Sequence, residues 1–201
     1  MTLPVPEKPV ANRPTNDKNA LRTAMRERRR DFAASLDVAT RAALENGLAD
    51  ALEPLFATAG SIAAYAPMMN EISPLGAVAR ASCVDVAVAF PFFVDRDSRM
   101  TFRVGTPVDP GPWGILQPAS GSAIISPDLI LMPLVAVDGA GNRIGMGKGH
   151  YDRALPGLRA AGARLIGCGW SFQRIDEQLA PDPWDIPLDG FASPDGLEMF
   201  R

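Results

Sequence analysis

The chain has 201 residues, of which 47% are hydrophobic and 21% charged, a composition typical of one globular domain with a sizeable core. Its formal net charge of −3 excludes an overall basic field, so we expect no nucleic-acid partner. No apolar run reaches the ~18 residues of a membrane span, and no signal-peptide core is visible near the start. The sequence therefore predicts a cytoplasmic protein without a membrane partner, and we expect a monomer.

Cysteine and histidine usage excludes several kinds of site. Cys83 and Cys168 lack the C-x-x-C spacing of a redox or zinc centre, which favours small core residues kept reduced. His150 is the single histidine of the chain, so no site can use two histidine ligands.

The first predicted element is a helix that starts near Asp17, a suitable N-cap. Residues 1–15 before it are rich in Pro, Asn and Lys and are expected to be a flexible lead-in. Residues 16–201 are expected to form a single domain. The arginine-rich run at 26–30 lies in this helix, and a solvated face is favoured over a nucleic-acid patch because the chain as a whole is acidic.

Helices and strands are expected to alternate along the rest of the chain. In order, the pattern predicts a helix at 37–55, a strand at 61–65, a helix at 72–81, a strand at 84–90 stopped by Pro91, a strand at 100–104, a structured Gly/Pro loop at 105–122, a strand at 128–137, a helix at 150–161 and a strand at 164–170. Pro133 cannot donate to a sheet, so it predicts a bulge or a break in the strand at 128–137. This alternation indicates an α/β domain with a mainly parallel sheet.

A glycine-rich segment at 138–153 follows the most apolar strand and precedes a helix, where open α/β sheets bind ligands. Gly145, Gly147 and Gly149 alternate, and glycine lets backbone N–H groups approach an anion closely. Lys148 adds a point charge, and the following helix presents its positive N-terminal end. These features predict a phosphate site.

The glycine spacing fits neither the P-loop, G-x-x-x-x-G-K-[ST], nor the Rossmann pattern, G-x-G-x-x-G. Glycines alone would indicate a tight turn without a ligand. The neighbouring Arg143, Lys148 and Asp152 favour an anion site. Asp152 and Asp185 are candidate magnesium ligands, because magnesium takes one or two carboxylates together with phosphate oxygens and water. For an aspartate in the first turn of a helix, stabilisation of the helix dipole is the alternative.

Residues 129–153 (LILMPLVAVDGAGNRIGMGKGHYDR) closely resemble the signature of the 5-formyltetrahydrofolate cyclo-ligase family, D-x-x-G-x-R-[LI]-G-x-G-x-G-[YFH]-Y-D after an apolar strand. Further resemblances follow in order along the chain: KNALR at 18–22, YAPMMNE at 65–71, WGILQP at 113–118, Gln173 and WDIPLD at 184–189. The resemblance implies a three-layer α/β/α fold like that of sugar-phosphate isomerases and CoA transferases. It also implies ATP- and magnesium-dependent closure of 5-formyltetrahydrofolate to 5,10-methenyltetrahydrofolate.

The same resemblance implies a role for each matching residue. Magnesium would be held by Asp152 and Asp185. The folate would be bound by Glu71, Trp113, His150 and Tyr151. Catalytic roles would fall to Arg143 and Lys148. ATP would be bound by Lys18, Arg22, Arg143, Gly145, Gly147, Lys148, Gly149 and Tyr151. Two residues depart from the usual family pattern, Met146 for Arg or Tyr and His150 for Tyr or Phe.

Two other functions remain open from the residues. A sugar-phosphate isomerase on the same fold would need a carboxylate or histidine base beside the glycine loop, and independence from nucleotide would distinguish it. A non-catalytic, RNA-associated relative would use the arginine run at 26–30 and an appended RNA module, for which 201 residues leave no room. The chain has no Ser-His-Asp or Cys-His set, which fits phosphoryl transfer better than nucleophilic catalysis.

Overall fold

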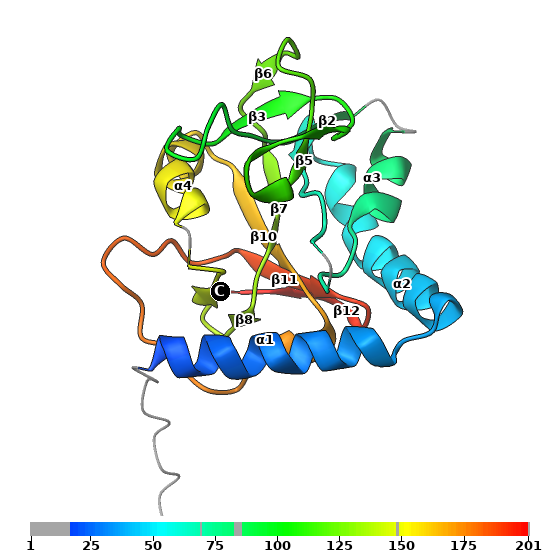
Figure 1. Ribbon diagram of the computed structural model, residues 1–201, viewed down its shortest axis with the longest axis vertical. Helices are drawn as coiled ribbons and strands as arrows, with labels where there is room; N and C mark the ends of the chain where they lie inside the picture. Colours follow the sequence, from blue (N-terminus) through cyan, green and yellow to red (C-terminus); the bar gives the residue numbers. More distant parts are fainter. Residues whose placement is uncertain (1–16, 69, 83–85, 148, 201) are drawn as a thin grey trace, which may run out of the picture.

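The computed structural model describes residues 17–68, 70–82, 86–147 and 149–200, so the expected lead-in at 1–15 and two residues named above, Cys83 and Lys148, lie outside it. The elements in chain order are α1 (Lys18–Ser35), α2 (Val38–Phe56), β1 (Ser61–Ala63), α3 (Leu75–Ser82), β2 (Ala87–Phe92), β3 (Thr101–Val104), β4 (Asp109–Pro110), the 3-10 helix η1 (Pro112–Gly114), β5 (Leu116–Gln117), β6 (Ile124–Ile125), β7 (Leu129–Pro133), β8 (Ala136–Val137), β9 (Arg143–Ile144), α4 (His150–Ala160), β10 (Arg164–Cys168), the 3-10 helix η2 (Ser171–Gln173), β11 (Gly190–Ser193) and β12 (Gly196–Met199) (Figure 1). Within the described ranges, no helix is both long and apolar enough to cross a membrane.

One large sheet has the strand order β12-β11-β10-β7-β1-β2-β3-β6. The five central strands, from β11 to β2, pair in parallel. The outer pairs β11–β12, β2–β3 and β3–β6 are antiparallel. The prediction of an α/β fold with a mainly parallel sheet is confirmed.

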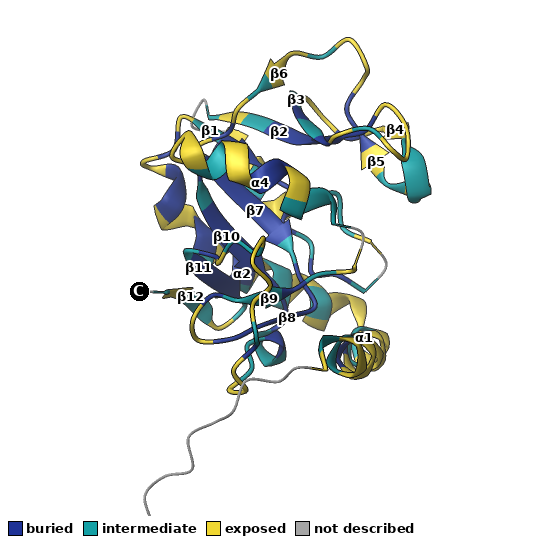
Figure 2. Cartoon of the chain, turned by 90° about the vertical axis from the view of Figure 1, so that its left-hand side faces the viewer, coloured by how far each residue is buried: buried dark blue, intermediate teal, exposed yellow. Residues whose placement is uncertain are grey.

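The two faces of this sheet are covered by different helices, as the alternation along β7 shows. Leu129 and Leu131 belong to the core under α2 and α3, whereas Ile130 and Met132 belong to the core under α4. The buried strands lie between exposed helical surfaces (Figure 2). The three-layer α/β/α arrangement is therefore confirmed.

Helix α1 packs on the small hairpin that follows β7. Its Met25 shares a buried cluster with Val135 and Ala136 of the β8 region, Ile144 of β9 and Leu179. In Figure 1 the helix runs below β8, beyond the end of β7. Because β7 is a central parallel strand, this position puts the start of α1 at the edge of the sheet where α/β proteins bind ligands.

Two prolines test the strand predictions. Pro133 ends β7, and the chain continues as β8 in a separate two-stranded sheet with β9, so the predicted break is confirmed. The prediction that Pro91 stops the second strand is wrong, because β2 continues to Phe92 and Pro91 pairs with Phe102 of β3. Pairing of β2 with β1 ends at Ala89, so the N–H that Pro91 lacks has no ladder partner on that side.

Candidate active site

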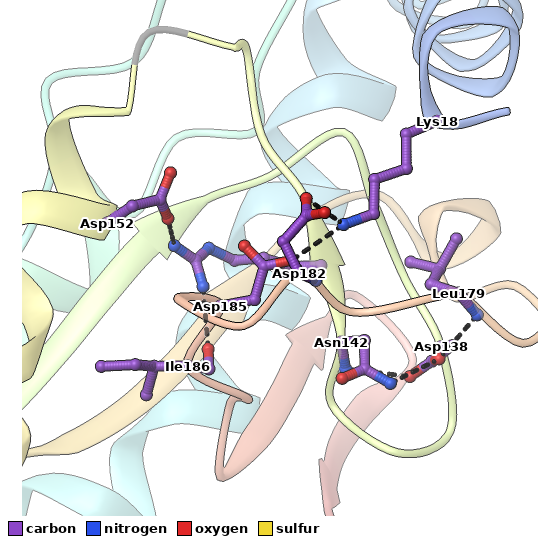
Figure 3. Close-up of polar contacts among 9 residues, drawn as sticks. Lys18, Asp138, Asn142, Asp152, Leu179, Asp182, Asp185 and Ile186 are labelled. Carbon is purple, nitrogen blue, oxygen red and sulfur yellow. Dashed lines mark hydrogen bonds and ion pairs between the residues drawn. The ribbon is translucent and has the colours of Figure 1, made fainter. Parts of the chain in front are cut away.

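The turn between β8 and β9 is built around a buried carboxylate. Asp138 accepts hydrogen bonds from the backbone N–H groups of Ala140, Asn142 and Leu179, each at 2.9 Å. Figure 3 shows Asp138 beside Asn142 and Leu179. Asp138 is only 1% exposed, so these bonds satisfy a charge that burial would otherwise make costly. The turn therefore delivers Arg143, the first residue of β9, to a fixed place.

The glycine loop after β9 uses the left-handed backbone region. Gly147 has φ +82° and Gly149 has φ +65°, conformations that side-chain-bearing residues rarely adopt. Gly149 is the N-cap of α4 and, being glycine, offers no side chain of its own to cap the helix. The N-terminal end of α4 thus adjoins the loop, and such a helix end favours an anion.

Arg143 joins the loop to two other segments. Its Nη2 forms an ion pair with Asp152 of α4, and its Nη1 donates to the backbone oxygen of Ile186 at 2.9 Å. The Arg143 side chain is 8% exposed, so a carboxylate partner is needed to offset the loss of hydration. The arrangement places Asp152 on one side of Arg143 and the segment that carries Asp185 on the other.

Lys18, at the first turn of α1, lies between two carboxylates. Its Nζ is 2.8 Å from both Asp182 and Asp185, whose oxygens converge on the ammonium (Figure 3). Burial acts to raise the pKa of Asp185, but hydrogen bonds from Lys18 and the Asp182 backbone, with the charges of Lys18 and Arg143, outweigh it and lower that pKa. Asp185 is therefore held as an anion.

Arg22, one turn further along α1, contacts the glycine loop directly. Its Nε donates to the backbone oxygen of Gly145 at 2.9 Å, and its guanidinium lies 3.8 Å from the point where a Cβ on Gly147 would stand. Arg22 thus brings the first helix to the glycine loop, whereas Lys18 meets the segment at 182–185.

The candidate folate carboxylate, Glu71, is buried at 5% exposure. Its Oε2 accepts from the backbone N–H of Met68 at 2.9 Å, and its Oε1 lies 3.6 Å from Nη1 of Arg29. Burial raises the pKa of Glu71, while the Met68 hydrogen bond and the Arg29 charge lower it and offset part of that rise. The expectation of a solvated arginine face at 26–30 is wrong for Arg29, which is 6% exposed and points inward.

Aromatic rings gather at the start of α4. The ring centroid of His150 lies 4.5 Å from that of Trp113 and 4.8 Å from that of Phe93. Trp113 has a left-handed backbone (φ +59°) in the expected structured loop. In the same loop, the Gln117 side chain accepts a hydrogen bond from the backbone N–H of Phe93 and donates one to the backbone oxygen of Phe93. The next residue, Tyr151, is half-buried, and burial raises its pKa, so it stays a neutral phenol.

The structure thus brings most of the predicted site residues together. The candidates around the glycine loop are in contact with one another or adjacent in the chain: Lys18, Arg22, Arg143, Gly145, Gly147, Gly149, His150, Tyr151, Asp152 and Asp185. Trp113 joins them through His150. Glu71 joins them through Arg29, whose Nη2 lies 3.7 Å from Sδ of Met146 in the glycine loop. Lys148 lies outside the described residues.

Two residues of this constellation were not singled out from the sequence. Asp182 and Asp185 both form ion pairs with Lys18. Asp182 lies three residues before Asp185, and this short spacing was the signal that the sequence offered. Arg29 stands four residues after the buried Met25, a spacing that puts both on one helix face. The helical period was therefore enough to predict that Arg29 turns inward.

The carboxylates present fit a magnesium ion that arrives with phosphates. Among the described residues, no three His, Cys, Asp or Glu side chains form a ready metal-binding group. Asp152 and Asp185 could supply the one or two carboxylates that magnesium prefers, and phosphate oxygens and water would then complete its shell.

A family model described as the 5-formyltetrahydrofolate cyclo-ligase family matches residues 14–194. The chain is 32% identical over 109 residues to the 5-formyltetrahydrofolate cyclo-ligase of Haemophilus influenzae, an alignment that covers 52% of this chain and 58% of that relative. It is 29% identical over 192 residues to that of Mycolicibacterium smegmatis, with 88% and 93% covered.

Solved structures give the same answer for the fold. The NMR structure of Aquifex aeolicus 5,10-methenyltetrahydrofolate synthetase aligns with a TM-score of 0.76 and 25% identity, over 92% of this chain and 93% of that one. The synthetase from Mycoplasma pneumoniae aligns with a TM-score of 0.68 and 24% identity, over 89% and 99%. With the family model covering nearly the whole sequence, this chain belongs to the 5-formyltetrahydrofolate cyclo-ligase family.

Proposed function

We propose that this protein is a cytoplasmic, ATP- and magnesium-dependent cyclo-ligase that converts 5-formyltetrahydrofolate to 5,10-methenyltetrahydrofolate and releases ADP and phosphate. The main observation in support is that α1, the glycine loop and the segment at 182–185 come together around Lys18, Arg22 and Arg143. Three cations and a helix N-terminus at one edge of the sheet suit a polyphosphate.

The reaction proceeds by transfer of one phosphoryl group. The formyl oxygen attacks the γ-phosphorus of ATP, and the bond to the β,γ-bridging oxygen breaks to release ADP. Nitrogen 10 then closes on the formyl carbon and loses its proton, and the C–O bond to the phosphate breaks. Chemistry of this kind requires in-line positioning and charge neutralisation rather than a protein nucleophile, which agrees with the residues at the site.

The charged residues would change partners when ATP binds. Arg22 and Arg143 would bind phosphate oxygens, together with Lys148 and the N–H groups at the start of α4. Lys18 and Arg143 would then leave Asp185 and Asp152, whose carboxylates become free to hold magnesium. The bound metal would supply positive charge at the phosphates.

The folate would bind beside these groups. The buried carboxylate of Glu71 is suited to the N–H edge of a pterin, and Trp113 and Tyr151 offer flat apolar surfaces to the ring system. Because His150, Tyr151 and Asp152 follow one another in the first turn of α4, the folate and phosphate contacts come from the same short segment.

The test is an assay for the absorbance of the methenyl product from 5-formyltetrahydrofolate, with and without ATP and magnesium. The proposal requires product only when both are present. The isomerase alternative requires turnover of a sugar phosphate without nucleotide, and absence of any ATP-dependent product would contradict the cyclo-ligase proposal.

A further inference from the structure

Arg29 is a buried cation on a helix whose other neighbouring arginines are exposed. It is 6% exposed, whereas Arg26, Arg28 and Arg30 face solvent. Burial lowers the pKa of Arg29, and the nearby Glu71 carboxylate opposes that shift. A charge removed from water in this way destabilises the fold unless its partners are well placed, so the partners indicate what the residue is for.

The guanidinium of Arg29 contacts three segments around the site. Nη1 donates to the backbone oxygen of Leu134 at 3.2 Å, just after β7, and lies 3.6 Å from Oε1 of Glu71. Nη2 donates to Sδ of Met146 in the glycine loop at 3.7 Å. Backbone anchoring at Leu134 fixes the guanidinium, and the guanidinium in turn fixes one oxygen of Glu71.

The two oxygens of Glu71 are not equivalent. Oε2 takes the Met68 N–H at 2.9 Å, while the 3.6 Å separation between Oε1 and Arg29 is an ion-pair distance, too long for a hydrogen bond. Oε1 is therefore attracted by a cation yet keeps its capacity to accept hydrogen bonds. That combination suits a carboxylate waiting for a donor on a ligand.

We propose that Arg29 is a positioning residue for the folate: it holds the Glu71 carboxylate as an anion with Oε1 open to the pterin. Arg29 acts through Glu71 and does not touch the reacting atoms. The proposal rests on the function proposed above and assigns a role to a residue that neither the glycine loop nor the metal carboxylates explain.

Other ionisable groups near Glu71 do not replace Arg29. Tyr65, after β1, and Tyr151, of α4, both have pKa values raised by burial and further raised by the Glu71 charge, so they stay neutral. Arg41 of α2 binds the main-chain oxygen of Glu71, at 2.9 Å, rather than its carboxylate. Among the residues that the structure describes, Arg29 is thus the cation that forms an ion pair with the Glu71 side chain.

The decisive experiment measures equilibrium binding of 5-formyltetrahydrofolate, without ATP, from about pH 6 to about pH 9. Without the cation, burial raises the Glu71 pKa further and only the Met68 hydrogen bond still opposes that rise, so more of the carboxyl group is protonated at the lower pH values. Arg29→Met should therefore weaken binding most at the low end of this range, by up to about tenfold for each unit by which the pKa rises. The ratio of variant to wild-type dissociation constants should fall as the pH rises and Glu71 ionises again.

Three further variants separate positioning from simple damage. Arg30→Gln is the matched control, because Arg30 is an exposed neighbour paired only with exposed Asp31 in the described structure, and it should bind folate like wild type. Arg29→Lys keeps the charge, so its ratio to wild type should not vary with pH. In the double variant Arg29→Met/Glu71→Gln, the loss should equal that of Glu71→Gln alone.

The outcomes are distinguishable. A ratio for Arg29→Met that is constant with pH, a pH-dependent ratio for Arg29→Lys, or additive losses in the double variant would each overturn the role of Arg29. If Arg29→Met does not fold, Arg29→Lys carries the pH test. Wild-type protein that binds no 5-formyltetrahydrofolate would instead contradict the proposed function itself.

Discussion

Replacing Gly147 by valine tests whether the glycine loop binds phosphate through its backbone. Gly147 has φ +82°, and an L-residue in the left-handed region costs about 1–2 kcal/mol, with more for a β-branched side chain. Among the described residues beyond its chain neighbours, a Cβ there would meet Arg22 at an ordinary contact distance of 3.8 Å, so the conformation rather than a collision carries the cost. With little packed against it, the substituted loop should relax out of this conformation.

ATP would then have to restore the original loop, so the penalty should appear in binding. A cost of about 1–2 kcal/mol weakens affinity by about 5- to 30-fold, and the bulk of valine beside the phosphates adds to this. Calorimetric titration of ATP with magnesium into the folded variant measures the loss. Lys148→Ala should cost less, because we expect the backbone N–H groups to make most of the phosphate contacts.

Gly162 provides the matched control. It has φ +90°, and no described residue beyond its chain neighbours has an atom within 4 Å of the point where its Cβ would stand, so the strain of a valine there is similar. It lies in the turn after α4, where Gly162 and Ala163 donate to Arg159 and Leu158 and the conformation belongs to the fold. Gly162→Val should lower the melting temperature without changing ATP affinity. If Gly147→Val behaves in the same way, the glycines only shape a turn and the reasoning is refuted.

Three further changes test the charged residues. Arg22→Ala should raise the Michaelis constant for ATP more than that for folate, because the Arg22 guanidinium contacts the glycine loop. Steady-state kinetics with each substrate varied in turn measures both constants, and a larger rise in the folate constant would contradict this placement. Asp152→Asn should remove most activity while circular dichroism shows a folded protein, and near-normal activity at limiting magnesium would argue against a metal ligand. Lys18→Met should let Mn²⁺ bind without nucleotide more tightly than to wild type, because the ammonium no longer neutralises Asp185; equal affinities in an electron paramagnetic resonance titration would exclude this competition.

The regular elements were predictable where local chemistry decides them. Asp17 and Asp37 accept hydrogen bonds from Ala20 and Thr40, the N-cap contacts that mark where α1 and α2 begin. The later helix expected at 72–81 begins only at Leu75, after Pro74. Strands β6, β9, β11 and β12 were not predicted, because each has two to four residues and owes its pairing to neighbours brought by the tertiary fold.

The site was predictable as a set of residues but not as a set of contacts. Lys18 and Asp185 are 167 residues apart, and nothing local indicates that they form an ion pair. The resemblance assigned Lys18 and Arg143 to phosphate and Asp152 and Asp185 to magnesium. In the structure these cations and carboxylates form ion pairs with one another. Pairing stabilises partly buried opposite charges when no ligand is present.

This pairing divides the site into two parts with different physical behaviour. Lys18 and Asp185 are each about one-fifth exposed, so water can enter and the two charges can exchange partners at modest cost when ATP and metal arrive. Arg29 and Glu71 are nearly completely buried and each is also hydrogen-bonded to backbone, so separating them would leave two uncompensated charges. Under the proposed function, the part around Lys18 and Asp185 would rearrange when ATP and metal bind, while the Arg29–Glu71 pair would hold the folate in place.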